Sequence, residues 1–96
     1  MDDLKMERLC AEAMGLENPR VTEYTKGSPF VTYGPSDQAV LPQYCPLQSD
    51  LQAMALAKSD PLLFSDIVVE WRHTGGDLNR LIVTAFARIQ KAKKAA

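Results

Sequence analysis

The C-terminal segment 77–89 has the sequence DLNRLIVTAFARI, and its apolar residues recur at helical spacing. One face of such a helix carries Leu78, Leu81, Ile82, Ala85, Phe86 and Ile89. Asp77 follows two glycines, and its carboxylate can accept hydrogen bonds from the exposed amides of a first helical turn. We therefore predict a helix over residues 77–93, and the rest of the chain must supply the surface that buries its apolar face.

Two further segments have helical character. Residues 3–14 place Met6, Leu9, Cys10, Ala13 and Met14 on one stripe, and Gly15 follows where a helix commonly ends. Residues 50–58 consist mostly of good helix formers behind a potential N-cap at Ser49 or Asp50. Pro61 disfavours further helix at Asp60. These patterns predict helices over 3–14 and 50–58.

A strand is predicted over residues 65–73, where apolar and polar residues alternate. Ile67, Val69 and Trp71 would share one side of the strand. Asp66, Glu70 and Arg72 would share the other. Alternation of this kind and β-branched residues are typical of a strand with one face in water.

Residues 16–48 are the least regular part and contain five of the six prolines, so long elements are not expected there. Two short β-like runs around Gly27 predict a hairpin within 20–34, and an irregular segment that packs only its aromatic rings is the alternative. Residues 1–96 then form a single α+β domain. Its small, antiparallel sheet would be covered by about three helices, in an arrangement like an α/β/α sandwich.

Composition bounds the class of protein. The chain has 96 residues, 46% of them hydrophobic, and a mean hydropathy of −0.19, which is typical of one globular domain and of neither a disordered nor a membrane protein. The acidic N-terminus lacks the features of an export signal, so we expect a cytoplasmic protein. Cys10 and Cys45 are too few for a disulfide scaffold and should be thiols there.

Few residues suggest catalysis or metal binding. His73 is the only histidine, and the cysteines lack the close spacing of zinc ligands, so we expect no metal and no cofactor. Gly75-Gly76 before the last helix could cradle a phosphate, but Asp77 would repel it, which favours a structural turn. His73 could form a nucleophilic pair with Cys10 or Cys45, but Cys10 lies on the apolar stripe of its helix, which leaves Cys45 as the candidate for an exposed thiol. Because no convergent set emerges, we expect no catalytic residue.

Two groups of residues are candidates for binding a macromolecule. The aromatic group is Tyr24, Phe30, Tyr33 and Tyr44, which would form a protein-contact patch or simply cover the sheet. The basic group is Arg80, Arg88, Lys91, Lys93 and Lys94, because residues 78–96 contain five cations and no acid. These cations would contact nucleic acid, or they would offset the helix dipole on a solvated face.

Three segments resemble the phage ABA sandwich domain family of small bacteriophage proteins. They are LCAEAMGL at 9–16, LPQYCPLQSDLQA at 41–53 and LIVTAFARI at 81–89. The chain departs from the family pattern at Cys45-Pro46 and in a long insert at 18–40. The resemblance implies a small sheet with helices packed on it, in a phage-encoded protein that works in the host cytoplasm. It implies no reaction, because the family has none established.

These observations favour a non-enzymatic phage accessory protein that covers a surface of a host or phage protein. Inhibition of a host defence is one such role. The alternative is a nucleic-acid-binding module that uses the basic C-terminal helix, and an enzyme that uses Cys45 is the third hypothesis.

Overall fold

The computed structural model describes residues 1–37 and 40–96, and it contains helices and a small sheet. In chain order the elements are α1 (Asp3–Ala13), β1 (Arg20–Thr22), β2 (Phe30–Thr32), β3 (Gln43–Tyr44), α2 (Asp50–Lys58), α3 (Pro61–Thr74) and α4 (Leu78–Ala95). The strands form one antiparallel sheet in the order β1-β2-β3. The predicted α+β class with a small antiparallel sheet is therefore confirmed.

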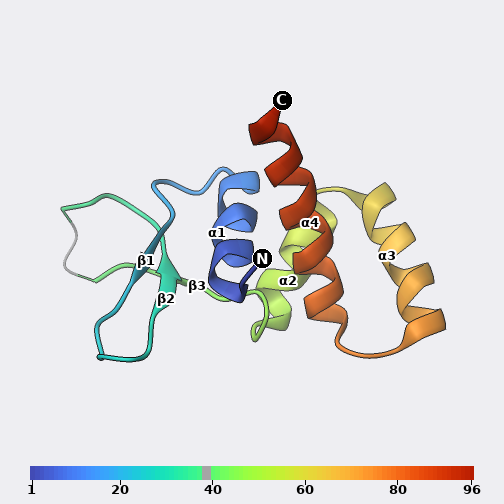
Figure 1. Ribbon diagram of the computed structural model, residues 1–96, viewed down its shortest axis with the longest axis horizontal. Helices are drawn as coiled ribbons and strands as arrows, with labels where there is room; N and C mark the ends of the chain where they lie inside the picture. The colour runs from blue at the N-terminus through green and yellow to red at the C-terminus, as the bar shows by residue number, and fades with distance from the viewer. Residues whose placement is uncertain (38–39) are drawn as a thin grey trace.

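Helix α4 is the centre of the helical part. It contacts α1, α2 and α3, whereas α1 contacts all three strands. Figure 1 shows the consequence: the sheet lies at one end, α1 stands between it and α4, and α3 forms the opposite edge. The helices thus extend from one side of the sheet, whereas an α/β/α sandwich would cover both of its faces.

The core is shared among elements far apart in the sequence. Leu56 of α2, together with Ile82 and Val83 of α4, is at most 1% exposed, and the core continues through Cys10 of α1 to Val31 of β2. Burying large apolar side chains contributes about 1.5–3 kcal/mol each, so this core accounts for more stability than the exposed ion pairs do.

Each of the helices α1, α2, α3 and α4 begins at a side-chain N-cap. Asp2, Ser49, Asp60 and Asp77 accept hydrogen bonds from the amides of Lys5, Gln52, Leu63 and Arg80, at 2.8, 3.2, 3.2 and 3.3 Å. The caps at Ser49 and Asp77 agree with the sequence pattern, and so do the three helices predicted over 3–14, 50–58 and 77–93, within two residues at each end.

The strand predicted over 65–73 is wrong, because this segment lies within helix α3. Pro61 occupies the first turn, where its missing amide hydrogen would have had no helical partner, so the proline begins a helix here. Ile67 is buried while Leu62 and Val69 are exposed, which is a helical distribution. Packing against α2 and α4 has overridden the β-propensity of the Ile67–Val69 run.

The hairpin predicted within 20–34 is present, and a third strand extends it. Val21 pairs with Val31, and Val31 pairs with Tyr44 on its other side. Gly27 lies in the turn with φ +87°, a conformation that favours glycine. Among the described residues, no helix combines the length and apolarity required to cross a bilayer.

Candidate functional site

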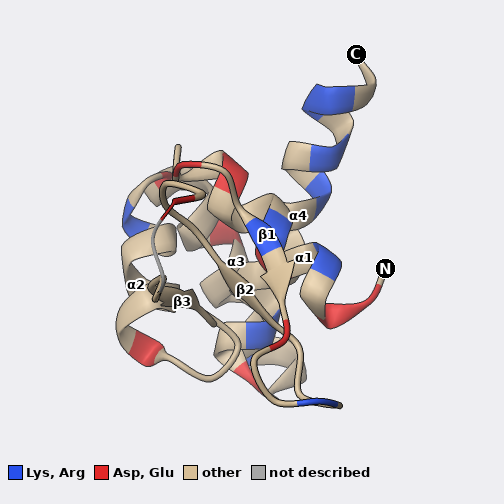
Figure 2. Cartoon of the chain, turned by 90° about the vertical axis from the view of Figure 1, so that its left-hand side faces the viewer, with Lys and Arg blue, Asp and Glu red and all other residues tan. Residues whose placement is uncertain are grey.

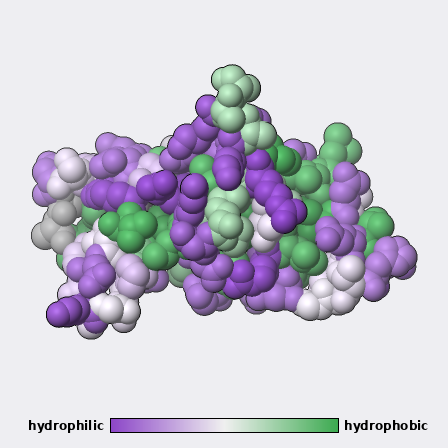
Figure 3. Space-filling view, in the orientation of Figure 1, coloured by the Kyte–Doolittle hydropathy of each residue, from purple (hydrophilic) through white to green (hydrophobic). Residues whose placement is uncertain are grey.

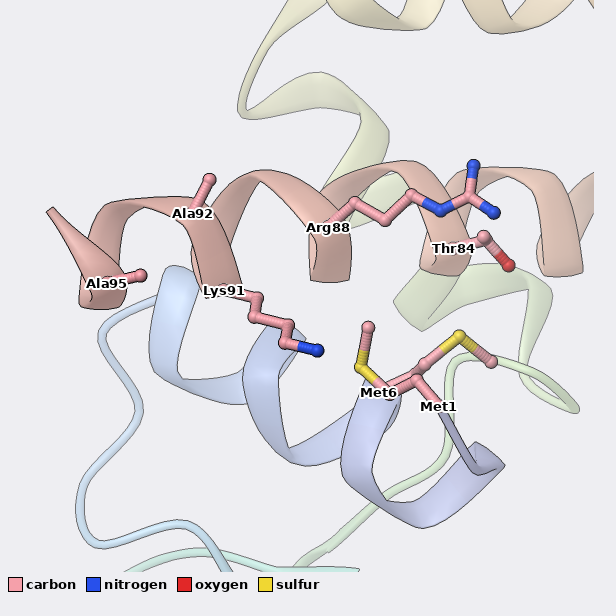
Figure 4. Close-up of a pocket in the computed structure, with 7 residues that line it drawn as sticks. All are labelled: Met1, Met6, Thr84, Arg88, Lys91, Ala92 and Ala95. Carbon is pink, nitrogen blue, oxygen red and sulfur yellow. The ribbon is translucent and has the colours of Figure 1, made fainter.

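A groove lies between the N-terminal part of the chain and α4, with a cavity volume of about 630 Å³. Its lining is Met1, Met6, Thr84, Arg88, Lys91, Ala92 and Ala95 (Figure 4). The α4 members are three or four residues apart along one face of the helix, apart from the adjacent Lys91 and Ala92. Methionine and alanine make much of the surface apolar, and no lining residue is acidic.

Two ion pairs connect α1 to α4. Arg80 donates to both carboxylate oxygens of Asp3, at 2.9 and 3.1 Å. Lys94 lies 3.0 Å from the carboxylate of Glu12. The hydrogen bonds from Arg80 lower the pKa of Asp3 below its ordinary value. Because the Asp3–Arg80 pair is half exposed, it orients the helices more than it stabilises them.

Arg88 and Lys91 lie between these pairs along α4, and neither forms an ion pair within the part of the chain that the structure describes. Figure 4 shows the Arg88 side chain running along α4 toward Thr84, while Lys91 extends toward Met6. The groove therefore combines two available cations with thioether and methyl groups. Such a surface favours a ligand that is anionic on one side and apolar on the other.

The five predicted nucleic-acid contacts are consequently divided among different environments. Arg80 and Lys94 are held by carboxylates, and Lys93 lines a separate cavity of about 180 Å³ beside α3. Only Arg88 and Lys91 share the groove. Figure 2 shows the cations along the C-terminal half of α4, which projects beyond the other helices.

The four aromatic residues of the predicted contact patch form two separate pairs. Tyr24 packs against Phe30 with ring centroids 5.5 Å apart, and Tyr33 meets Tyr44 edge-on at 6.4 Å. Tyr24 is 55% exposed, whereas Tyr44 is only 5% exposed, and burial raises the pKa of its hydroxyl. Tyr44 is therefore a core residue of the sheet itself, and the expected surface patch does not include it.

The thiols lack the environment of an activated nucleophile. Cys10 is buried, its sulfur donates to the Val83 carbonyl at 3.4 Å, and burial raises its pKa to about 12. Cys45 is partly buried, and desolvation, followed by the nearby charge of Glu7, raises its pKa as well. A thiolate is the reactive form, so both environments disfavour reaction. Among the described residues, no three His, Cys, Asp or Glu side chains cluster closely enough to hold a metal ion.

Two features escaped prediction from the sequence. Glutamate side chains are mostly exposed in proteins, yet Glu7 is 5% exposed and accepts a hydrogen bond from the Leu47 amide at 3.3 Å. Its spacing of three from Cys10, on the apolar side of α1, was the available signal. The second feature is the presence of Met1 and Met6 in the groove lining. The sequence does not reveal it, because their position depends on how α1 packs against α4.

Comparisons with known proteins identify no relative: no family model matches the chain, and no curated protein or solved structure matches it either. The likeness to the phage ABA sandwich domain family stays a prediction from the three sequence segments.

Proposed function

We propose that this protein is a non-enzymatic binding protein that covers a surface of a host or phage protein and holds a segment of that partner in the groove between α1 and α4. The observation that carries the proposal is the pairing of Arg88 and Lys91, both without a carboxylate partner among the described residues, with an apolar lining. The thiol environments, which disfavour reaction, support a binding role over a Cys45 enzyme.

The lining favours a protein segment over nucleic acid. Recognition of single-stranded nucleic acid commonly adds aromatic stacking to phosphate contacts, and the groove lining contains no aromatic residue. Methionine side chains, in contrast, adapt to apolar side chains of varied shape, as in other proteins that bind peptide segments.

The biological setting of the proposal rests on the sequence resemblance. The segments at 9–16, 41–53 and 81–89 support a phage-encoded accessory protein that works in the host cytoplasm. A protein of this size can act by steric covering alone, and inhibition of a host defence protein is the role that we propose for it.

Capture of the partner tests the function. Tagged protein incubated with lysate from infected cells should retain one stoichiometric partner, identified by mass spectrometry. The variant carrying Arg88→Glu and Lys91→Glu should lose it, since it reverses the charge of the groove. Lys93→Glu is the control for position, because it reverses one charge of α4 outside the groove. Equal recovery by all three proteins would refute the role of the groove.

Nucleic acid is the second candidate, supported by the cations on the projecting half of α4. Phosphate contacts release counterions, so binding of this kind weakens steeply as salt rises. A gel shift at 50 mM salt that disappears at higher salt, and is lost in the Arg88→Glu, Lys91→Glu variant, would favour this candidate instead.

A further inference from the structure

The outer face of α3 combines exposed apolar side chains with two carboxylates. Leu62 is 82% exposed and Val69 is 51% exposed, so two large aliphatic side chains of this helix lie outside the core. Asp66 and Glu70 lie on the same helix, and neither forms an ion pair within the described ranges 1–37 and 40–96. In Figure 3 hydrophobic side chains are visible at the edge of the molecule that α3 forms.

Helix geometry places these residues in two adjacent rows. Leu62 and Val69 are seven residues apart, so they align along the outward side of α3. Asp66 and Glu70 are four residues apart and lie along one flank of that apolar row. Arg72 follows Val69 by three residues and lies along the other flank, so the outer face of α3 is amphipathic and has its carboxylates on one side of the apolar row.

The groove has the opposite charge and a matching arrangement. Arg88 and Lys91 are three residues apart on α4, so they lie about one helical turn apart on one face, as Asp66 and Glu70 do on α3. Beside them lie the methyl and thioether groups of Met6, Ala92 and Ala95. A helix with an acidic flank beside an apolar row satisfies both parts of this surface, which is the helix-in-groove mode of recognition.

We infer that the groove of one copy binds the outer face of α3 of a second copy. Within one molecule α3 lies at the far edge from the sheet and the groove lies between α1 and α4, so the outer face turns away from the groove (Figure 1). The two surfaces differ, and the contact is therefore head-to-tail, which allows a ring or an open chain. The inference rests on the proposed function, because both use the groove between α1 and α4. A second copy of the chain therefore competes with the foreign partner for this groove.

The contact is small. One helix face against one groove falls at the low end of specific interfaces, so we expect weak self-association that depends on protein concentration. Sedimentation velocity over a range of protein concentrations at low salt should detect this association in the wild-type chain, and higher salt should weaken it.

Charge reversal tests the pairing. The groove variant (Arg88→Glu, Lys91→Glu) and the α3 variant (Asp66→Lys, Glu70→Lys) should each weaken self-association by about tenfold or more. A chain with all four substitutions should associate again, because opposite charges then face each other once more. Lys93→Glu should leave association unchanged. Circular dichroism checks that each variant is folded. Where a charge-reversal variant is unfolded, a neutral substitution at the same positions takes its place: Arg88→Gln, Lys91→Gln, Asp66→Asn or Glu70→Gln.

Three results would overturn the inference: a monomeric wild-type chain at millimolar concentration, a groove variant that associates like wild type, or a folded fourfold variant that stays monomeric. The α3 variant distinguishes failure of the self-association inference from failure of the proposed function. Its groove is intact, so it should still capture the foreign partner from lysate even where self-association is lost.

Discussion

At the scale of single residues, Glu7 is an acidic side chain that the fold buries, since it is only 5% exposed. Burial raises the pKa of its carboxyl above the ordinary value of 4.5, and the Leu47 amide offsets part of that effect. The folded state therefore binds this proton more tightly than the unfolded state. The stability that the group contributes is fully present below pH 4.5 and is lost as the pH rises through the higher folded pKa.

Glu7→Gln should consequently stabilise the protein at pH 7 and make little difference near pH 4. Glutamine is uncharged at both pH values, and its side-chain oxygen can still accept from the Leu47 amide. Urea unfolding at the two pH values measures the difference. Glu17→Gln is the control, because Glu17 is exposed and its replacement should change stability little at either pH. A Glu7→Gln variant less stable than wild type at pH 7 would show that the ionised carboxylate is favourable here.

At the scale of elements, the helix caps make the next prediction. Asp77 begins α4, and its carboxylate accepts from the Arg80 amide. Asp77→Ala removes this acceptor and should cost about 0.5–2 kcal/mol of stability, whereas Asp77→Asn retains an acceptor and should cost less. Thermal or urea unfolding of both variants provides the comparison. Equal losses in the two variants would assign the effect to the charge rather than to the hydrogen bond.

The elements also show which parts of the fold a sequence reveals. The helices over 3–14, 50–58 and 77–93 have local signals, namely apolar spacing and cap residues, and these signals agree with one another. In α3 they conflict: Asp60-Pro61 indicates a helix start, but the β-branched run at Ile67–Val69 favours a strand. The deciding interaction is packing against α2 and α4, which is not local.

The third strand and the groove were beyond prediction for a similar reason. Strand β3 consists of Gln43 and Tyr44 alone, and it exists because Tyr44 pairs with Val31 across the sheet. Arg88 and Lys91 were identified as candidate contacts from their charge and spacing. Met6, which lines the groove with them, comes from the other end of the chain. Local periodicity carries no information about how α1 packs against α4.

At the scale of the whole molecule, α4 connects all the other helices, and the sheet is attached to this assembly through α1. The two ends of the chain thus share one core. Disruption at the centre of α4 should therefore unfold the whole molecule rather than a part of it.

Ile82→Asp tests this cooperativity. Ile82 is 1% exposed among α4 and its neighbours, and a buried carboxylate without a partner costs several kcal/mol in addition to the lost apolar contacts. Small domains have roughly 5–15 kcal/mol of stability in total, so the variant should be unfolded or nearly so at 25 °C. Ile89→Asp makes the same change on the same helix, but Ile89 is 40% exposed and the charge can reach water, so this variant should fold. Circular dichroism melts compare the two, and an Ile82→Asp melt close to that of wild type would mean that α4 is not the centre of a cooperative core.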